Sequence, residues 1–212
     1  SKIANHPVRV FCSGRTDAGV HAQEQVIHFE TQTTRTYGAW LFGGNANLPS
    51  DVNFKWAKEV NDDFHARFNA HARSYEYKIH HHAIRSSLKT GYYLWEPRSL
   101  NINEMRKAAA FLVGEHDFSC FRGSMCQAKS PIKTIEYLQI DEIGDDLIIK
   151  VKANAFLHHM VRNLVGTLLK IGRGEENPEW MLSVLDSKDR KEAGPTAEPQ
   201  GLYFVKAHYQ SL

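Results

Sequence analysis

The chain has 212 residues, of which 42% are hydrophobic and 24% charged, and its formal net charge at pH 7 is +2. This composition is typical of a globular protein with one large or two small domains, and it excludes a disordered or low-complexity chain. No apolar stretch is long enough to cross a membrane, so no membrane partner is expected. Three cysteines at unrelated spacings match neither a disulfide framework nor a zinc motif, and reduced thiols predict a cytoplasmic protein.

The first sixty residues alternate short apolar runs with turn residues. Apolar runs and alternating patterns predict strands over residues 8–12, 26–30 and 52–60. A turn-rich segment, Ser13 to Gly19, separates the first two strands. A short helix is predicted over residues 37–44 and is ended by residues 45–49.

The rest of the chain mixes longer strands with amphipathic helices. A strand over residues 72–80 would place Tyr75, Tyr77 and Ile79 on one face. Apolar periodicity, caps and turn signals predict helices over 103–113 (capped by Asn103 or Asn101), 158–171 and 179–185, a hairpin of 135–140 with 147–151, and a last strand over 201–205. These elements favour an α+β fold with a largely antiparallel sheet, divided into an N-terminal domain (1–62) and a C-terminal domain (63–212).

Basic residues concentrate in one part of the sequence. Residues 65–89 hold five Lys or Arg side chains, among them Arg67 and Arg73, together with five histidines and a single acid, Glu76. Residues 119–134 hold three more basic residues and no acid. Basic zones with interleaved aromatic residues suit a polyanion such as RNA, because Lys and Arg displace counterions from phosphates. A solvated surface with clustered charges is the alternative interpretation.

The segment Gly14-Arg15-Thr16-Asp17-Ala18-Gly19-Val20-His21 is the most informative part of the sequence. It follows a predicted strand, where a rigid element can present a loop. One interpretation of Asp17 is a residue whose side chain closes an Asx-type turn. The other is a carboxylate nucleophile that a nearby cation keeps ionised.

This segment resembles the catalytic motif of the A family of tRNA pseudouridine synthases. Further segments resemble the family in the same order, at residues 26–31, 45–49, 63–68, 72–77, 114–118, 153–163 and 201–203. The resemblance therefore spans almost the whole chain. Family members open with a strand and a helix that are absent here, so we expect additional residues before Ser1.

The resemblance implies a role for several residues. Asp17 would be the nucleophile, Arg162 its charged partner, and Tyr75 would stack on the target uracil and take the proton from its C5 atom. Arg15 would hold the extruded nucleotide, and the other expected substrate contacts are Arg67, Arg73 and His21. From the residues alone, a surface arginine on a packed helix is the favoured interpretation of Arg162, and a core or sheet tyrosine is the commoner interpretation of Tyr75.

No cofactor and no metal are expected, because the reaction needs no redox change and no external group. His80-His81-His82 lie on a predicted strand, where neighbouring side chains point to opposite faces. His158-His159 would lie on a helix, pointing some way apart and lacking the four-residue spacing of a zinc-binding helix.

The family fold consists of two α/β domains with ferredoxin-like halves, whose mostly antiparallel sheets flank a basic cleft. The resemblance implies conversion of uridine to pseudouridine at positions 38, 39 and 40 in the anticodon stem-loop of tRNA, by a homodimer. Three neighbouring targets predict recognition of tRNA shape rather than of base sequence.

Two other classes of function remain open from the residues. A non-catalytic RNA-binding module would also show strand aromatics and basic loops, but it would not need an acid at Asp17. A glycosidase-like nucleotide hydrolase would need a second carboxylate as the acid, and only Glu24 and Glu30 lie near Asp17 in the sequence. An Asp17→Asn variant separates the enzyme from the binding module, because only the enzyme loses turnover.

Overall fold

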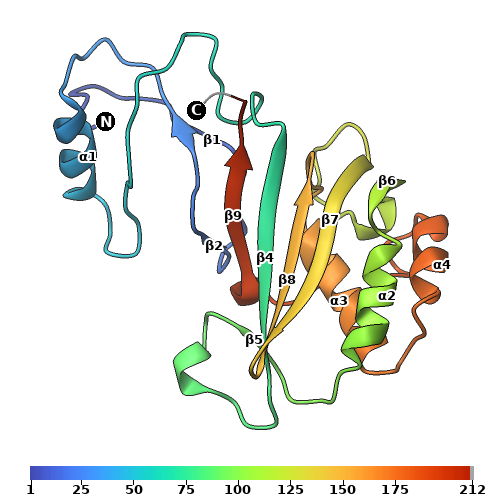
Figure 1. Cartoon of the computed structure of the whole chain (residues 1–212). Helices are drawn as coiled ribbons and strands as arrows, with labels where there is room; N and C mark the ends of the chain where they lie inside the picture. The colour runs from blue at the N-terminus through green and yellow to red at the C-terminus, as the bar shows by residue number, and fades with distance from the viewer. Residues whose placement is uncertain (211–212) are drawn as a thin grey trace. The chain divides into compact units, whose positions relative to one another are not determined.

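The computed structural model describes residues 1–210 and divides into two compact units (Figure 1). One unit comprises Ser1–Gly14 and Val26–Asn69, and the other comprises Arg15–Gln25 and the chain from Ala70 onward. The units differ from the predicted ranges 1–62 and 63–212, since the loop with Asp17 belongs to the second unit. The reason is a two-residue strand just after this loop, which pairs with the last strand of the chain.

The first unit is built from short elements. Strands β1 (Phe11–Cys12) and β3 (Ile27–His28) form an antiparallel pair. Helix α1 (Tyr37–Asn45) agrees with the predicted helix, and Thr36 caps it by accepting a hydrogen bond from the backbone of Ala39.

The predicted strand over residues 52–60 is wrong, because this segment forms no strand. Its backbone pairs with a side chain instead of a neighbouring strand. Phe54 donates its N–H to Asn45 Oδ1 over 2.6 Å, and its carbonyl oxygen accepts from Asn45 Nδ2 over 3.0 Å. An alternating pattern predicts which residues are extended, but a ladder also needs a partner strand.

The second unit contains a seven-stranded sheet. Six strands follow the order β2-β9-β4-β8-β7-β6, and β5 pairs with β4. Pairing is antiparallel except for β2 with β9 and β4 with β5, which confirms the predicted, mostly antiparallel α+β class. In chain order the strands are β2 (His21–Ala22), β4 (Ala72–His81), β5 (Leu94–Glu96), β6 (Gly114–Asp117), β7 (Ile132–Ile143), β8 (Asp146–Ala153) and β9 (Leu202–His208).

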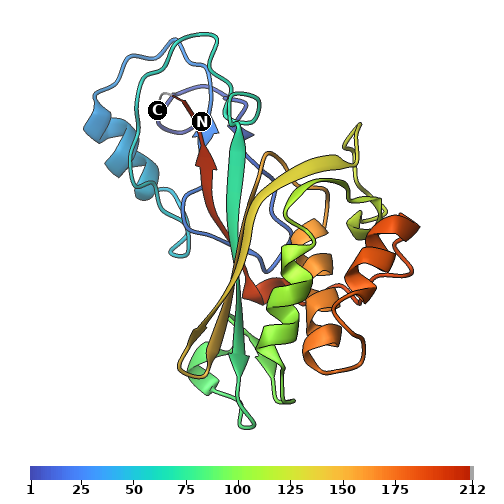
Figure 2. The same ribbon diagram turned by 45° about the vertical axis from the view of Figure 1, so that its right-hand side comes forward.

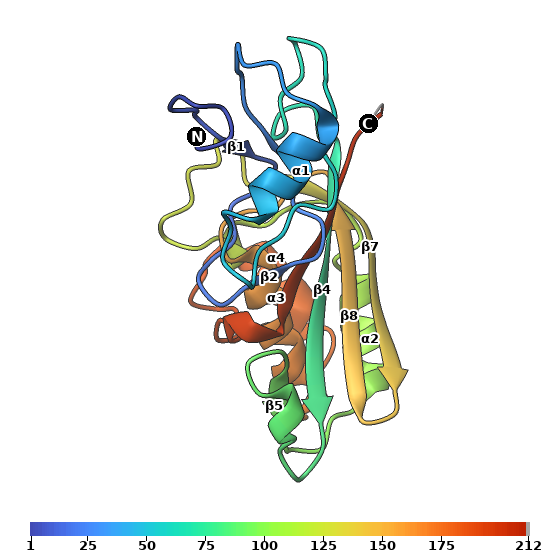
Figure 3. The ribbon, with the colours of Figure 1, turned by 90° about the vertical axis from the view of Figure 1, so that its left-hand side faces the viewer.

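Three helices cover one face of this sheet (Figure 2). They are α2 (Ile102–Ala110), α3 (Met160–Gly172) and α4 (Trp180–Ser187), and short 3₁₀ turns occur at Ser87–Lys89, Ser119–Phe121 and Pro199–Gly201. The predicted helices are confirmed, with α2 capped by Asn101. Strands β8 and β9 lie on either side of β4, and β7 lies beyond β8, as Figure 3 shows from the side.

Helix α3 is the central element of the core. Almost all of its residues are buried, and Leu164 and Leu168 lie against the sheet and helices α2 and α4 in one continuous cluster. Burying a leucine side chain contributes about 1.5–3 kcal/mol, so this cluster fixes the helix firmly. The helix therefore provides a rigid platform for the side chains at its first turn.

The fold bears on two expectations from the sequence, which concern membrane spans and cysteine pairing. Among residues 1–210, no helix is long and apolar enough to span a membrane. All three cysteines are unpaired.

Candidate active site

Asp17 lies in a tight turn that the backbone closes without help from its side chain. The carbonyl oxygen of Asp17 accepts a hydrogen bond from the N–H of Val20 over 3.1 Å. Gly19, at the third position, has φ +82°, which is the backbone conformation that a type II turn requires and that glycine adopts without strain. The carboxylate is therefore not used up in an Asx-type turn and can contact other groups.

The first of those groups is Arg162, on the first turn of α3. Its Nη1 donates to Asp17 Oδ2 over 2.9 Å, a contact between residues 145 positions apart in the sequence. The carboxylate also lies beside the N-terminus of α3, since its contacts come from residues 158–162. The positive end of the helix dipole and the guanidinium both attract the negative charge of Asp17.

Two histidines that precede α3 complete the surroundings of this carboxylate. His159 Nε2 lies 3.2 Å from Asp17 Oδ2, and His158 Nε2 lies 3.4 Å from Oδ1. Their rings stack on each other with centroids 3.8 Å apart. The prediction that these side chains point apart on a helix is wrong, because the helix begins only at Met160 and His159 has a left-handed backbone with φ 61°.

Arg162 is held by a strap, which we define as residues 194–199. Arg162 Nε donates to the carbonyl oxygen of Ala197 over 2.7 Å, and the N–H of Ala197 donates back to the carbonyl of Arg162 over 3.1 Å. A Cβ atom at Gly166 would lie 1.7 Å from the carbonyl oxygen of Pro195, so only glycine lets the strap approach α3 this closely. The guanidinium is therefore positioned from two sides, by its helix and by the strap.

Buried polar groups fix the strap in turn. Tyr77 donates its hydroxyl to the carbonyl oxygen of Glu198 over 2.6 Å. Asn163, which is fully buried, accepts at its Oδ1 from Arg190 and from the hydroxyl of Thr196. Because each buried polar group has a partner, this network specifies one arrangement rather than several.

Tyr75 lies on β4, at a register shift between β4 and β9. Its ring packs edge-on against Phe156 and Phe204, with centroids 4.9 and 5.3 Å away. Burial raises the pKa of Tyr75 to about 12; the charge of Arg73 opposes this shift and the charge of Asp17 adds to it. The hydroxyl is therefore neutral at physiological pH and feels the field of the Asp17 carboxylate.

Comparison with known proteins identifies the family. A family model described as tRNA pseudouridine synthase matches residues 1–69 and 108–210. The chain belongs to the tRNA pseudouridine synthase family. Among its relatives, a protein from Vibrio campbellii named tRNA pseudouridine synthase A is 52% identical over 209 residues, which cover 99% of this chain and 79% of that protein. Proteins of the same name from Alcanivorax borkumensis and Nitrosococcus oceani are 49% and 50% identical, covering 100% and 99% of this chain and 79% and 81% of theirs.

This family membership makes the chain an enzyme of the isomerase class. The ranges matched by the tRNA pseudouridine synthase model include Asp17, the two histidines and Arg162, whereas Tyr75 lies in the gap from residue 70 to 107. The relatives match across that gap, because the aligned segments cover nearly all of the chain.

The residues predicted to contact substrate lie in different surroundings. Arg15 is exposed, two positions before Asp17. His21 is stacked between the rings of Tyr92 and Tyr203, and its Nε2 contacts the carbonyl oxygen of Gly91 over 2.9 Å. These contacts anchor the loop around Gly91 to β2 and β9.

Some basic side chains in the zone predicted to bind a polyanion hold backbone loops. Arg73 Nη1 donates to the carbonyl oxygens of Ala70 and Asn154, and Arg122 Nη2 donates to those of Cys126 and Ala128. Arg67 is exposed, in the first unit. A guanidinium that holds backbone carbonyls stabilises a loop, so a count of basic residues overstates the number available for phosphates.

The Asp17 carboxylate and the two histidines offer three metal-ligand atoms within 4.8 Å of one another. Arg162 Nη1, only 2.9 Å from Oδ2, already places a positive charge beside this carboxylate. A metal ion would have to coexist with that cation, so the arrangement fits an arginine-held carboxylate better than a metal centre.

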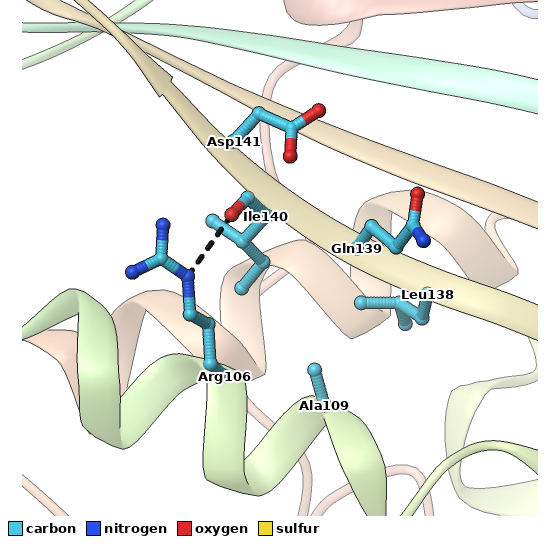
Figure 4. Close-up of a pocket in the computed structure, with 6 residues that line it drawn as sticks. All are labelled: Arg106, Ala109, Leu138, Gln139, Ile140 and Asp141. Atoms are coloured by element: carbon cyan, nitrogen blue, oxygen red, sulfur yellow. Dashed lines mark hydrogen bonds between the residues drawn. The ribbon is translucent and has the colours of Figure 1, made fainter.

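A shallow pocket of about 350 Å³ lies elsewhere, between α2 and β7 (Figure 4). Arg106 extends across it and donates from Nε to the carbonyl oxygen of Ile140 over 3.1 Å. Its guanidinium also binds Glu142. The pocket is thus bordered by a side chain that joins helix to strand, and it carries none of the predicted catalytic residues.

Sequence reasoning missed the contribution of His158 and His159. Adjacent histidines gave no spacing signal, because their convergence depends on one left-handed residue that no local pattern announces. One signal was available in the sequence. His158 and His159 lie four and three residues before Arg162, just before the helical turn that presents the arginine.

Proposed function

We propose that this enzyme converts uridine to pseudouridine at positions 38, 39 and 40 of the tRNA anticodon stem-loop, with Asp17 as the nucleophile. The observation that carries the proposal is the Asp17–Arg162 contact of 2.9 Å at the first turn of α3. The Asp17 side chain keeps 29% of its surface exposed, so a nucleotide can reach an oriented carboxylate.

The reaction rearranges bonds without any net gain or loss of atoms. The bond from ribose C1′ to uracil N1 breaks, a bond from C1′ to C5 forms, and the proton leaves C5 while N1 gains one. A carboxylate can assist by bonding to the sugar carbon or to the base while the base turns. In the attack on C1′, the Asp17 oxygen displaces N1, and it leaves again when C5 attacks C1′.

Arg162 orients the nucleophile in this scheme. Its Nε and Nη1 are committed to Ala197 and Asp17, respectively, so the guanidinium cannot rotate without losing one of these contacts. A fixed donor beside the carboxylate reduces the reorganisation needed when the charge of Asp17 changes during bond formation.

Tyr75 is proposed to stack on the target uracil and to receive the C5 proton. Its aromatic packing supports the first role, because Phe156 and Phe204 hold the ring in place. Its pKa of about 12 keeps the hydroxyl protonated, so a proton can be accepted only if the phenol passes on its own. Stacking is therefore the main role that we propose for Tyr75, and proton transfer from C5 is the minor one.

We further propose that Arg15, Arg67, Arg73 and His21 contribute to substrate binding, the exposed Arg15 and Arg67 by direct contact, and Arg73 and His21 through the loops that they hold. Three neighbouring target positions imply recognition of tRNA backbone and shape, with the target base extruded from the stem. A cytoplasmic homodimer that uses no cofactor, with two α/β domains and a basic cleft, is the assembly we propose for this reaction.

The test is to incubate full-length protein with unmodified tRNA and to map pseudouridine by chemical labelling and primer extension. We expect conversion at positions 38, 39 and 40 in substrates that carry uridine there, and none with Asp17→Asn. Absence of pseudouridine with the wild-type protein would overturn the proposal. Conversion by the Asn variant would remove Asp17 from its role.

The non-catalytic RNA-binding module is disfavoured by the same geometry. A binding module needs no carboxylate facing an arginine inside a partly exposed site, and a carboxylate there would repel phosphate. The Asp17→Asn variant separates the two when binding and turnover are both measured, since the enzyme should retain affinity for tRNA and lose pseudouridine formation.

A further inference from the structure

We propose that His158 and His159 are positioning residues that give the two oxygens of Asp17 different tasks, leaving Oδ1 to form the bond to substrate. This inference rests on the proposed role of Asp17 as nucleophile. It concerns the two histidines that precede α3, to which the sequence assigned no role.

The guanidinium and the two ring nitrogens that surround Asp17 approach its two oxygens unequally. Oδ2 lies 2.9 Å from Arg162 Nη1 and 3.2 Å from His159 Nε2. Oδ1 has a single neighbour of this kind among the described residues, His158 Nε2, at the longer distance of 3.4 Å. Electron density on Oδ2 is thus stabilised by two close groups, and Oδ1 keeps the lone pairs that are free to attack.

The buried nitrogen of His158 determines which way its ring donates. Its Nδ1 is buried and has no hydrogen-bond partner in the described structure. Gly123 packs against this nitrogen so closely that a Cβ atom there would lie 2.8 Å from it. A buried N–H without an acceptor is costly, so the proton belongs on Nε2, which faces Asp17.

His159 reaches the carboxylate through an unusual backbone. Its φ of 61° and ψ of 2° place it in the left-handed region, where side chains other than glycine, asparagine, aspartate and histidine are uncommon. Consecutive residues of a helix diverge by about 100°, so two helical histidines could not stack and face one carboxylate. Backbone strain of this kind is retained where the surrounding structure makes use of it.

The surroundings of His159 favour its uncharged form. Burial lowers the pKa of His159; the charge of Asp17 opposes the shift, while His158, Arg162 and Arg190 add to it. Among the described residues, Arg162 is the side chain that donates a hydrogen bond to this carboxylate. An uncharged His159 ring contacts Asp17 without neutralising it, which preserves the nucleophilicity of the carboxylate.

The test compares His159→Phe with His159→Gln in steady-state turnover of tRNA. Phenylalanine keeps the ring stack on His158 but removes the polar ring nitrogen beside Asp17 Oδ2, and we expect kcat to fall about 10-fold with KM unchanged. Glutamine restores an N–H at similar reach, and kcat should return to within a few-fold of wild type. His116→Phe, a histidine on β6 that contacts the carbonyl of Val113, is the matched control and should leave turnover unchanged.

Thermal unfolding of each variant shows whether a loss of kcat comes from a loss of folded protein. If the phenylalanine variant does not fold, His159→Asn replaces it, because asparagine tolerates the left-handed backbone but is too short to reach Asp17. A wild-type kcat in a folded phenylalanine or asparagine variant would overturn the proposal. Equal losses of kcat in the phenylalanine and glutamine variants would also overturn it. Failure of the proposed function looks different, since wild-type protein would then make no pseudouridine at all.

Discussion

Helix α3 carries a carboxylate–arginine cluster at each end, and the two clusters differ in how completely the carboxylate is enclosed. At the N-terminus, Asp17 meets Arg162, and 29% of the Asp17 side chain is exposed. At the C-terminus, Glu96 of β5 meets Arg173 and Arg98, and only 2% of its side chain is exposed. The carboxylate of the first cluster is therefore accessible to solvent, whereas the carboxylate of the second is enclosed by protein.

The sealed cluster satisfies every acceptor. Glu96 Oε1 accepts from the N–H and Nε of Arg98, and Oε2 accepts from Arg98 Nη2 and from Nε and Nη2 of Arg173. Burial opposes the ionisation of Glu96, but the hydrogen bonds from the two arginines outweigh it and hold the pKa of Glu96 below its ordinary value. This carboxylate joins β5 to the end of α3 and has no lone pair left for chemistry.

The helix dipole acts oppositely at the two ends. Arg173 lies where the negative end of the dipole favours a cation, whereas Arg162 lies at the positive end, which disfavours one. Arg162 is held there by Asp17 and by the carbonyl oxygen of Ala197. The comparison teaches that an ion pair serves structure when saturated and aligned with its helix, and can serve chemistry when its carboxylate stays accessible.

The largest difference between the clusters should appear on removing the charge of Asp17. We expect Asp17→Asn to lower pseudouridine formation at least about 1,000-fold, since it removes the nucleophile. Folding should be nearly unchanged, because the turn is closed by backbone atoms. Pseudouridine mapping measures the activity of the variant, and thermal unfolding measures its stability. If Asp17→Asn remained active, the accessible cluster would not be catalytic.

The matching change in the sealed cluster is Glu96→Gln. It leaves the partly buried Arg173 and the exposed Arg98 without their anion and should lower the free energy of unfolding by about 1.5–3 kcal/mol, as for hydrogen bonds to a charged group, with turnover per folded molecule unchanged. Urea unfolding, together with activity normalised to folded protein, measures both. A loss of turnover without a loss of stability would contradict the structural role.

The Glu96→Gln variant also separates the two clusters by the pH dependence of protein stability. Because the pKa of folded Glu96 is depressed, its ion pairs contribute stability above the ordinary value of 4.5 and lose it as pH falls through the folded pKa. Wild-type stability should therefore decline in acid below about pH 4.5, by an increment that Glu96→Gln lacks. Equal acid sensitivity of both proteins would be inconsistent with this assignment.

Arg162→Lys is expected to have an intermediate effect on turnover. Lysine keeps the charge but has no planar fork, so it cannot hold Asp17 and Ala197 together. We expect kcat to fall about 10- to 100-fold, as for loss of one charge-assisted hydrogen bond. Arg173→Lys is the matched change at the other end of α3, and it should affect stability rather than kcat.

The smallest effect is expected for Tyr75→Phe. The variant keeps the ring and its packing against Phe156 and Phe204, so stacking on uracil should survive and turnover should fall only a few-fold. Release of tritium from 5-tritiated uridine in tRNA measures the step in question. A loss comparable to that of Asp17→Asn would mean that the hydroxyl, rather than the ring, is essential.

Local sequence signals determined much of this protein. Apolar periodicity located helices α2, α3 and α4, because a helix that buries one face must repeat every three to four residues. The glycine and small residues around Asp17 predicted a turn, and Gly19 adopts the positive φ that this turn needs. The family resemblance named Asp17 and Arg162 together.

Tertiary structure alone decided the rest, because it depends on contacts between residues far apart in the chain. The sequence could not reveal that the side chain of Asn45 would pair with the backbone of Phe54, nor that β2 would join β9. Nor could it show the turn of His159 that brings two histidines onto one carboxylate. Periodicity reports which faces are buried, whereas pairing partners and strained backbones emerge only when the whole core is packed.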